Sequence, residues 1–265
     1  MMEYANGKIL AEVTDGIGTI TFNQPEKRNA MSIAMWDGMT QALEAFAAEA
    51  EVRVVVLTGA GDKAFVSGAD ISQFGEHRSS ADAQTQYDAL TSAGRQTLAA
   101  FGKPVIAQIR GFCLGGGLGI AMQADLRVAS EDSRFGIPAA RLGLGYGYDM
   151  VNKLVSLVGP SHAKMLLFSG ERVTGAEAAR MGLVNQLVPD DGLASAVGVL
   201  ARTLAGNAPL TIQAAKIAVD VSSGQDRHRT VEDIATAVAA CFDSADYREG
   251  RKAFMEKRKP RFTGR

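Results

Sequence analysis

The sequence is poor in cysteine and histidine and has no excess of either charge. Two cysteines, Cys113 and Cys241, are too few for a disulfide framework in 265 residues, which favours a reducing compartment. The 28 lysines and arginines balance 29 aspartates and glutamates, so we expect no nucleic-acid partner. The three histidines, His77, His162 and His228, lack metal-ligand spacing, and we expect no metal site.

Long apolar stretches are also absent. No segment reaches the roughly 18 uninterrupted apolar residues that a membrane-spanning helix needs. Residues 1–13 contain acidic residues and no long apolar run, unlike a signal or transit peptide. We therefore expect a cytoplasmic protein that has no membrane partner. What the sequence does contain is an ordinary globular composition, with 46% hydrophobic and 22% charged residues.

The first part of the chain alternates strand and helix patterns. Residues 9–23 alternate apolar and polar side chains around Asp15-Gly16, which predicts a hairpin. Helical spacing of apolar residues predicts a helix over 31–50 with Ser32 as its cap. Continuous β-branched runs predict strands buried on both faces. The segments 52–59, 103–111, 125–130 and 133–137 are the further predicted strands, and 119–124 is a short predicted helix.

Helical patterns dominate from Ser161 onward, interrupted by a single strand-like segment at 183–188. Strand and helix alternation before that point predicts an α/β fold whose sheet is mainly parallel and covered by helices. The change in pattern suggests two regions. We expect a core over residues 1–204 and a helical region over residues 205–265.

Two glycine turns, VSGADI at 66–71 and LGGGLG at 114–119, each follow a predicted buried strand. Such turns leave backbone N–H groups unpaired, and two of these aimed at one point form a site for a negatively charged oxygen. Close packing of helix on strand would explain either turn alone. A third glycine segment, GAGDKA at 59–64, fits the dinucleotide motif, but no helix pattern follows it, so a simple turn is the favoured interpretation.

Several segments together resemble one known family. They are NQPEKRNAMS (23–32), KAFVSGADI (63–71), IAQIRGFCLGGGLGIAMQADLRVAS (106–130), SRFGIP (133–138), FSGERVTGAEAARMGLVNQLVP (168–189) and AFMEKRKPRF (253–262). Their order and spacing resemble the enoyl-CoA hydratase/isomerase, or crotonase, superfamily over nearly the whole chain. The resemblance implies a crotonase-like spiral of ββα units with a C-terminal helical trimerisation region, in homotrimers or in hexamers made of two trimers.

The resemblance also implies an enzyme of fatty-acid or related acyl-CoA metabolism. An oxyanion hole holds the thioester oxygen in that family, and its two backbone N–H groups fall on Ala69 and Gly116. Coenzyme A belongs to the thioester substrate, so no separate cofactor is expected. The implied coenzyme A contacts are Lys27, Arg28, Ala30, Ser67, Asp70, Ile71, Phe254 and Lys257. A merely solvated side chain is the alternative for each of the lysines.

The sequence departs from the family at the positions that carry acid and base groups. Hydratases use two glutamates, which activate water and deliver a proton. The matching positions here are Gly119 and Ala139, and a third position that carries an aspartate in some relatives is Gly147. These absences argue against straightforward addition of water to an enoyl-CoA. A non-catalytic acyl-CoA-binding homologue is an alternative, although the paired glycine turns argue against it.

Two residues near position 147 are candidates to replace the missing groups. Tyr146 resembles a tyrosine of methylmalonyl-CoA decarboxylase, another superfamily member, and decarboxylation needs an oxyanion hole but no strong base. Asp149 follows in the same predicted loop. The alternatives are a pocket-wall aromatic for Tyr146 and a helix cap for Asp149.

Overall fold

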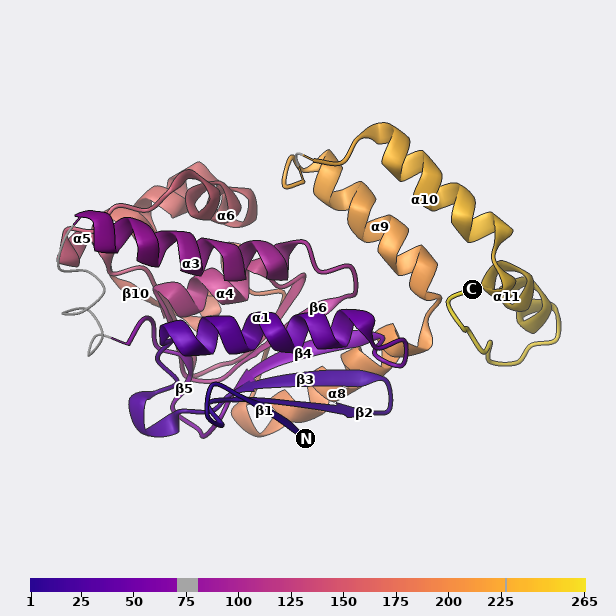
Figure 1. The fold of residues 1–265 in the computed structure, drawn as a ribbon, viewed down its shortest axis with the longest axis horizontal. Helices are drawn as coiled ribbons and strands as arrows, with labels where there is room; N and C mark the ends of the chain where they lie inside the picture. Colours follow the sequence, from indigo (N-terminus) through magenta and orange to yellow (C-terminus); the bar gives the residue numbers. More distant parts are fainter. Residues whose placement is uncertain (71–80, 227) are drawn as a thin grey trace.

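Two sheets form the frame of the fold in the computed structural model, which describes residues 1–70, 81–226 and 228–265 (Figure 1). The larger sheet has the order β1-β2-β3-β4-β6-β8-β11 and is parallel from β3 onward. Its strands are β1 Met2–Tyr4, β2 Ile9–Thr14, β3 Ile17–Phe22, β4 Val54–Gly59, β6 Val105–Ile109, β8 Leu126–Ser130 and β11 Gln186–Val188. The smaller sheet, β10-β9-β7-β5, comprises β10 Arg172–Thr174, β9 Arg134–Gly136, β7 Phe112–Leu114 and β5 Ala64–Val66.

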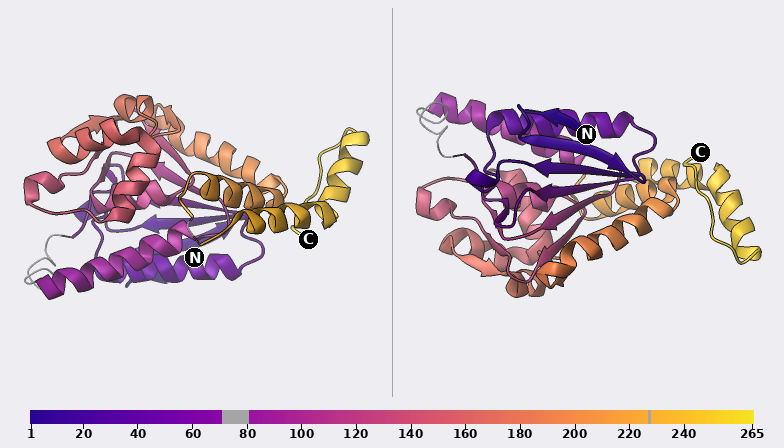
Figure 2. Two further views of the ribbon diagram at one scale, coloured as in Figure 1. Left: turned by 90° about the horizontal axis from the view of Figure 1, so that it is seen from above. Right: turned by 90° about the horizontal axis from the view of Figure 1, so that it is seen from below.

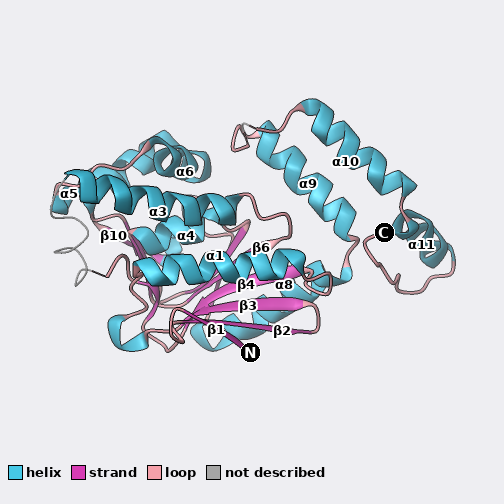
Figure 3. Cartoon of the chain, viewed as in Figure 1, coloured by secondary structure: helices cyan, strands magenta, loops and turns pink. Residues whose placement is uncertain are grey.

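Helices connect and cover these strands (Figure 3). They are η1 Pro25–Lys27, α1 Ile33–Ala48, α3 Ala81–Ala99, α4 Gly116–Gln123, α5 Ala139–Leu142, α6 Tyr148–Ser169, α7 Gly175–Arg180, η3 Asp190–Gly192, α8 Leu193–Gly206, α9 Pro209–Ser222, α10 Val231–Asp243 and α11 Ala245–Met255. Ser32 caps α1 as predicted, because its Oγ accepts a hydrogen bond from Met35 N at 3.3 Å. The predicted hairpin is also confirmed, with Asp15 and Gly16 both at positive φ between β2 and β3.

The central strands are buried on both faces, as their β-branched runs predicted. Val55 and Leu57 of β4 belong to the main core that α1 covers. Val54 and Val56 point the other way and pack with α8 residues such as Val197. Figure 2 shows the resulting layers, with α1 and α3 on one side of the large sheet and α8 on the other. This arrangement fixes the strand ends from which the site is built.

The last three helices extend away from the sheets (Figure 1). Helix α10 contributes no buried residue, and Val231, Phe242 and Phe254 of α10 and α11 are exposed. Helix α11, whose apolar residues are few and widely spaced, lies within the region expected to be helical. The division into residues 1–204 and 205–265 stays a prediction. Within the described part of the chain, no helix is long and apolar enough to cross a membrane.

Candidate active site

The two predicted glycine turns lie side by side in the structure. One follows β5 and the other follows β7, and these strands are parallel neighbours, so both turns lie at the same edge of the small sheet. A Cβ added to Gly115 would lie 3.9 Å from the Cα of Gly68. Both glycines have positive φ, 52° and 123°, which side chains rarely adopt. The folding of two distant segments therefore brings Ala69 close to the start of α4.

Two backbone N–H groups at these turns are left without acceptors among the residues that the structure describes. Gly116 is the first residue of α4, where the N–H has no partner within the helix. At the other turn, Met31 N donates to Gly68 O at 2.8 Å and Asp70 N donates to Met31 O at 2.9 Å, which leaves the N–H of Ala69 outside this bridge. Neither Ala69 N nor Gly116 N donates a hydrogen bond within residues 1–70, 81–226 and 228–265. The α4 N-terminus adds a partial positive charge at the same place.

Glycine occupies the first two positions of α4 for two different structural reasons. A Cβ on Gly116 would meet no atom of the described residues within 4 Å, so this position borders open space. A Cβ on Gly117 would lie 2.1 Å from the carbonyl oxygen of Val66, so α4 touches β5 at that residue. Gly117 thus serves the close helix-on-strand packing that the sequence left as an alternative. Gly116 leaves the backbone accessible.

The positions expected to carry glutamates hold no acid and are filled differently. A Cβ on Gly119 would lie 2.8 Å from Cε and 3.1 Å from Sδ of Met150, so the Met150 thioether occupies the space of a side chain there. Ala139 is 5% exposed and belongs to the core, directly after Pro138 at the start of α5. Gly147 is the N-cap of α6. The geometry therefore supplies an anion-binding turn without a carboxylate at these positions.

Tyr146 and Asp149 take up different places. The Tyr146 hydroxyl lies 3.8 Å from the Cβ position of Gly115, beside the unpaired N–H groups, and its ring packs against the core. Asp149 is exposed in the first turn of α6, where the positive end of the helix dipole stabilises its negatively charged carboxylate. It also lines a cavity beyond Met150. The structure thus brings the hydroxyl of Tyr146 beside the turns, and its role in a reaction stays a prediction.

The loop with η1 is attached to the first glycine turn. Lys27 Nζ forms an ion pair with Asp70 Oδ2 at 2.8 Å, and Ser67 N donates to Arg28 O at 3.1 Å. The Arg28 guanidinium lies 5.3 Å from the centre of the Phe112 ring. Lys27 and Arg28 remain exposed and form a positive rim, whereas Asp70 is buried.

Two further residues of this loop complete the comparison with the expected contacts. Ala30 is buried, at 8% exposed. Asn29, which sequence reasoning missed, is fully buried, and its Nδ2 donates to Ala60 O at 2.9 Å and to Ala64 O at 2.8 Å. Asn29 therefore holds the loop on the turn between β4 and β5. That turn contains the GAGDKA segment, and it leads into strand β5 rather than into the helix that a dinucleotide motif requires. Ile71 and His77 lie outside the described residues.

Comparisons with known proteins agree over almost the full length. The model of the enoyl-CoA hydratase/isomerase family matches residues 12–265. The chain is 34% identical to a crotonyl-CoA hydratase of Syntrophomonas wolfei, covering 98% of this chain and 99% of the relative. It is 34% identical to the 2,3-dehydroadipyl-CoA hydratase of Escherichia coli, covering 93% and 94%. A solved enoyl-CoA hydratase/carnithine racemase from Magnetospirillum magneticum superposes with a TM-score of 0.92 at 34% identity, covering 97% and 96%.

The chain belongs to the enoyl-CoA hydratase/isomerase family. Its mixed α/β architecture, with a parallel sheet and C-terminal helices, is the crotonase fold that the sequence motifs implied. It is accordingly a hydratase/isomerase-like enzyme of acyl-CoA metabolism.

Within one chain of this family member, Phe254 and Lys257 lie far from the other implied coenzyme A contacts. Figure 1 shows α11 at one end of the molecule and β5, which precedes the Ala69 turn, at the other. Phe254 is 86% exposed and Lys257 is exposed as well. Their contact with coenzyme A stays a prediction.

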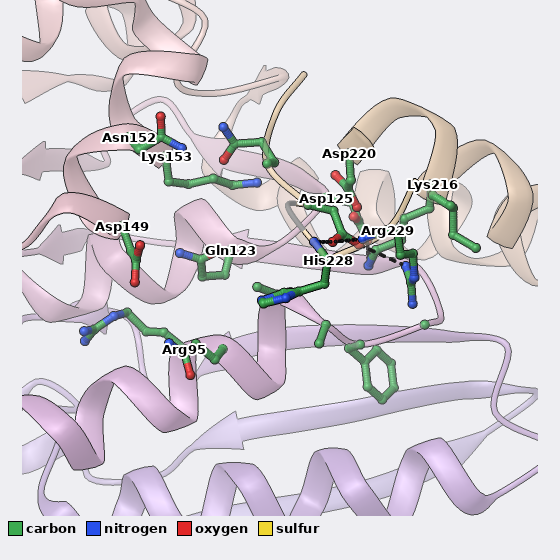
Figure 4. Close-up of a pocket in the computed structure, with 18 of the residues that line it drawn as sticks. Arg95, Gln123, Asp125, Asp149, Asn152, Lys153, Lys216, Asp220, His228 and Arg229 are labelled. Carbon is green, nitrogen blue, oxygen red and sulfur yellow. Dashed lines mark hydrogen bonds and ion pairs between the residues drawn. The ribbon is translucent and has the colours of Figure 1, made fainter. Parts of the chain in front are cut away.

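A polar cavity next to the site was not foreseen from the sequence. It has a volume of about 490 Å³ and lies between α3, α4, α6 and the segment from α9 to α10 (Figure 4). Arg95, Gln123 and Lys153 line it, each from a different helix. Their spacing in the sequence carries no signal, because only the packing of these helices brings them together.

Proposed function

We propose that the protein binds an acyl-CoA thioester with its carbonyl oxygen between Ala69 N and Gly116 N and stabilises the enolate formed from it. The observation that carries this proposal is the pair of unpaired N–H groups at adjoining turns. Charge that develops on the thioester oxygen is stabilised by both donors and by the positive end of α4. Each donor contributes about 3 kcal/mol to such a transition state. The Lys27 and Arg28 rim suits the phosphates of coenzyme A.

Addition of water is not the reaction that this geometry favours. It requires a base that takes a proton from water and an acid that protonates the α-carbon. Neither Gly119 nor Ala139 supplies a carboxylate, and Met150 fills the space beside Gly119. We therefore place the protein among the enolate-forming members that act without the two glutamates.

Decarboxylation is the second candidate, and the position of Tyr146 favours it. The bond between the α-carbon and a carboxylate breaks, its electron pair enters the thioester enolate, carbon dioxide leaves, and a proton then adds to the α-carbon. The oxyanion hole accepts the charge, so no strong base is needed. The Tyr146 hydroxyl, beside Gly115, is placed to hydrogen-bond the leaving carboxylate.

Infrared spectroscopy of bound crotonyl-CoA, isotope-labelled at the carbonyl, tests the oxyanion hole without assuming a reaction. Two hydrogen bonds polarise the thioester C=O, so we expect its stretching band to move to lower frequency on binding. Substituting Tyr148, which is exposed two residues beyond Tyr146, by phenylalanine should leave this shift unchanged. A bound thioester whose band stays at its position in water would contradict the proposal.

Tyr146→Phe tests the second candidate. Loss of a hydrogen bond to a charged group costs about 1.5–3 kcal/mol, so we expect the decarboxylation rate of methylmalonyl-CoA to fall at least about tenfold. Binding of the thioester should persist, because the phenyl ring keeps the packing of Tyr146 against the core. Tyr148→Phe is the matched control and should keep the parental rate. Equal rates in the two variants would show that the Tyr146 hydroxyl takes no part in the reaction.

We also propose that the protein assembles as a homotrimer, or as a hexamer of two trimers, in the cytoplasm. Helices α9, α10 and α11 enclose an apolar groove of about 710 Å³, lined by residues that include Ala214, Val238, Phe242 and Phe254. A groove of this kind on a monomer indicates an interaction site. A second copy seated there also explains how Phe254 and Lys257 reach a coenzyme A. Sedimentation equilibrium should give three or six times the chain mass, and a monomer mass would contradict this assembly.

A further inference from the structure

The thioether of Met150 lies about one helical turn from Gly116, on the same face of α4. Residues three apart on a helix are neighbours, with about 5–6 Å between their Cβ positions, so Gly119 lies next to Gly116 on this face. A Cβ on Gly119 would lie 2.8 Å from Met150 Cε and 3.1 Å from Met150 Sδ. The Cα–Cβ bonds of a helix tilt toward its N-terminus, so these two atoms cover the turn between Gly116 and Gly119. Met150 therefore lies at the edge of the open space beside Gly116, where a Cβ would meet no described atom within 4 Å.

Packing holds the Met150 side chain in this place. Met150 is 7% exposed and belongs to the main hydrophobic core. It lies in the first turn of α6, where Val151 N donates a hydrogen bond to Gly147 O at 3.2 Å. One turn further along α6, Leu154 is buried in the same core, at 1% exposed. Because this core is closely packed, the thioether cannot swing away from α4 without displacing other side chains. It is thus a fixed boundary of the open space.

Tyr146 and Met150 lie at opposite ends of the first turn of α4. The Tyr146 hydroxyl lies 3.8 Å from the Cβ position of Gly115, and Met150 covers Gly119, four residues later. Four residues of helix rise by about 6 Å. An extended chain advances about 3.3–3.6 Å for every three bonds, so it spans this length in about five bonds. The room between the hydroxyl and the thioether therefore suits an acyl group of about four carbons.

We infer that Met150 is a specificity-determining residue that limits the acyl group to about four carbons. The inference rests on the proposed function, because the acyl group lies against Met150 only when its carbonyl oxygen sits between Ala69 N and Gly116 N. Carbons beyond the fourth would overlap the thioether or pull the carbonyl out of the oxyanion hole. Met150 excludes longer chains in this way and takes no part in making or breaking bonds.

Infrared spectroscopy of butyryl-CoA and hexanoyl-CoA, each isotope-labelled at the carbonyl, tests this inference. Hydrogen bonds in the oxyanion hole lower the frequency of the thioester C=O stretch. In the parental protein we expect this shift for bound butyryl-CoA and not for hexanoyl-CoA, whose two further carbons collide with Met150. Met150→Ala removes the γ-carbon, the sulfur and the terminal methyl group, which makes room for those carbons. Both thioesters should therefore show the shift in this variant.

Calorimetric titration of the same two thioesters measures the size of the effect. Burial of two further methylene groups strengthens binding roughly tenfold, so hexanoyl-CoA should bind Met150→Ala about tenfold more tightly than butyryl-CoA does. In the parental protein butyryl-CoA should bind more tightly, because the hexanoyl chain has no room.

Leu154→Ala is the matched control, because it shortens a buried side chain one turn further along the same helix. It also opens a cavity in the core, yet it should keep the parental preference for butyryl-CoA. Met150→Leu retains the apolar bulk beside Gly119 and should keep this preference too. If Met150→Ala does not fold, Met150→Val takes its place, and the preference of the parental protein is a test in itself.

Three results would overturn the inference. They are equal carbonyl shifts for the two thioesters in the parental protein, a preference for butyryl-CoA that persists in Met150→Ala, and an equal loss of that preference in Leu154→Ala. Each of these results leaves the oxyanion hole in place. Absence of the shift for bound butyryl-CoA in the parental protein would overturn the proposed function as well.

Discussion

Gly116→Pro lowers turnover about 10²- to 10³-fold, the effect expected when one oxyanion donor is lost. Proline has no N–H, and it is tolerated at the first position of a helix, where Gly116 lies. The fold should therefore survive, which circular dichroism and a thermal unfolding curve would verify. The measurement is kcat on the acyl-CoA that the parental enzyme converts best, together with the affinity for that thioester.

Gly116→Ala separates the lost donor from the added atoms. Alanine keeps the N–H and adds only a Cβ, which faces open space in the described structure. We expect this variant to retain a much larger share of kcat than the proline variant. If Gly116→Pro keeps the parental turnover, the Gly116 N–H is not an oxyanion donor. Equal losses in the two variants would show that crowding, and not the donor, causes the effect.

Gly117→Ala destabilises the protein by about 3 kcal/mol or more, at the upper end of what overpacking costs. The added Cβ would lie 2.1 Å from the Val66 carbonyl oxygen and 2.7 Å from the Val66 Cβ, so α4 must move off β5. A backbone oxygen cannot rotate away as a flexible side chain can. Urea titration of the two alanine variants would measure the difference in free energy of unfolding.

The neighbouring Gly116→Ala variant is the control for this second prediction. Its Cβ meets no described atom within 4 Å, and alanine favours a helix over glycine by up to about 1 kcal/mol. We expect it to be as stable as the parental protein or slightly more so. If the two variants unfold at the same urea concentration, the close approach of α4 to Val66 does not constrain the fold.

Local signals were sufficient to predict most of the core. Ser32 and the apolar spacing of the next helix defined the start of α1, and Asp15-Gly16 defined the hairpin. The β-branched runs of β4 and β6 identified strands covered on both faces. The start of α4 was wrong by three residues, because glycines 116 and 117 weaken the helical pattern that the helix nevertheless includes.

Only part of the candidate site could be predicted from the sequence, and each residue that was missed has a physical reason. Motif spacing singled out Ala69 and Gly116, because each lies within a continuous segment that resembles the family, and the structure brings their two turns together. Met150 was missed, because its contact with Gly119 depends on how α6 packs on α4. Lys153 and Arg95 were missed for the same reason, since the cavity is assembled from helices far apart in the sequence.

A mass-spectrometric turnover assay of the purified protein against crotonyl-CoA, a β,γ-enoyl-CoA and methylmalonyl-CoA tests the central claim most directly. The claim is that the oxyanion hole stabilises an enolate without the two glutamates. It predicts a product formed through an enolate, either loss of carbon dioxide from methylmalonyl-CoA or isomerisation of the β,γ-enoyl-CoA, while crotonyl-CoA gains no water. Rapid gain of water on crotonyl-CoA would contradict it, because another group would then replace both carboxylates. Binding of all three thioesters without any product would indicate an acyl-CoA-binding protein instead.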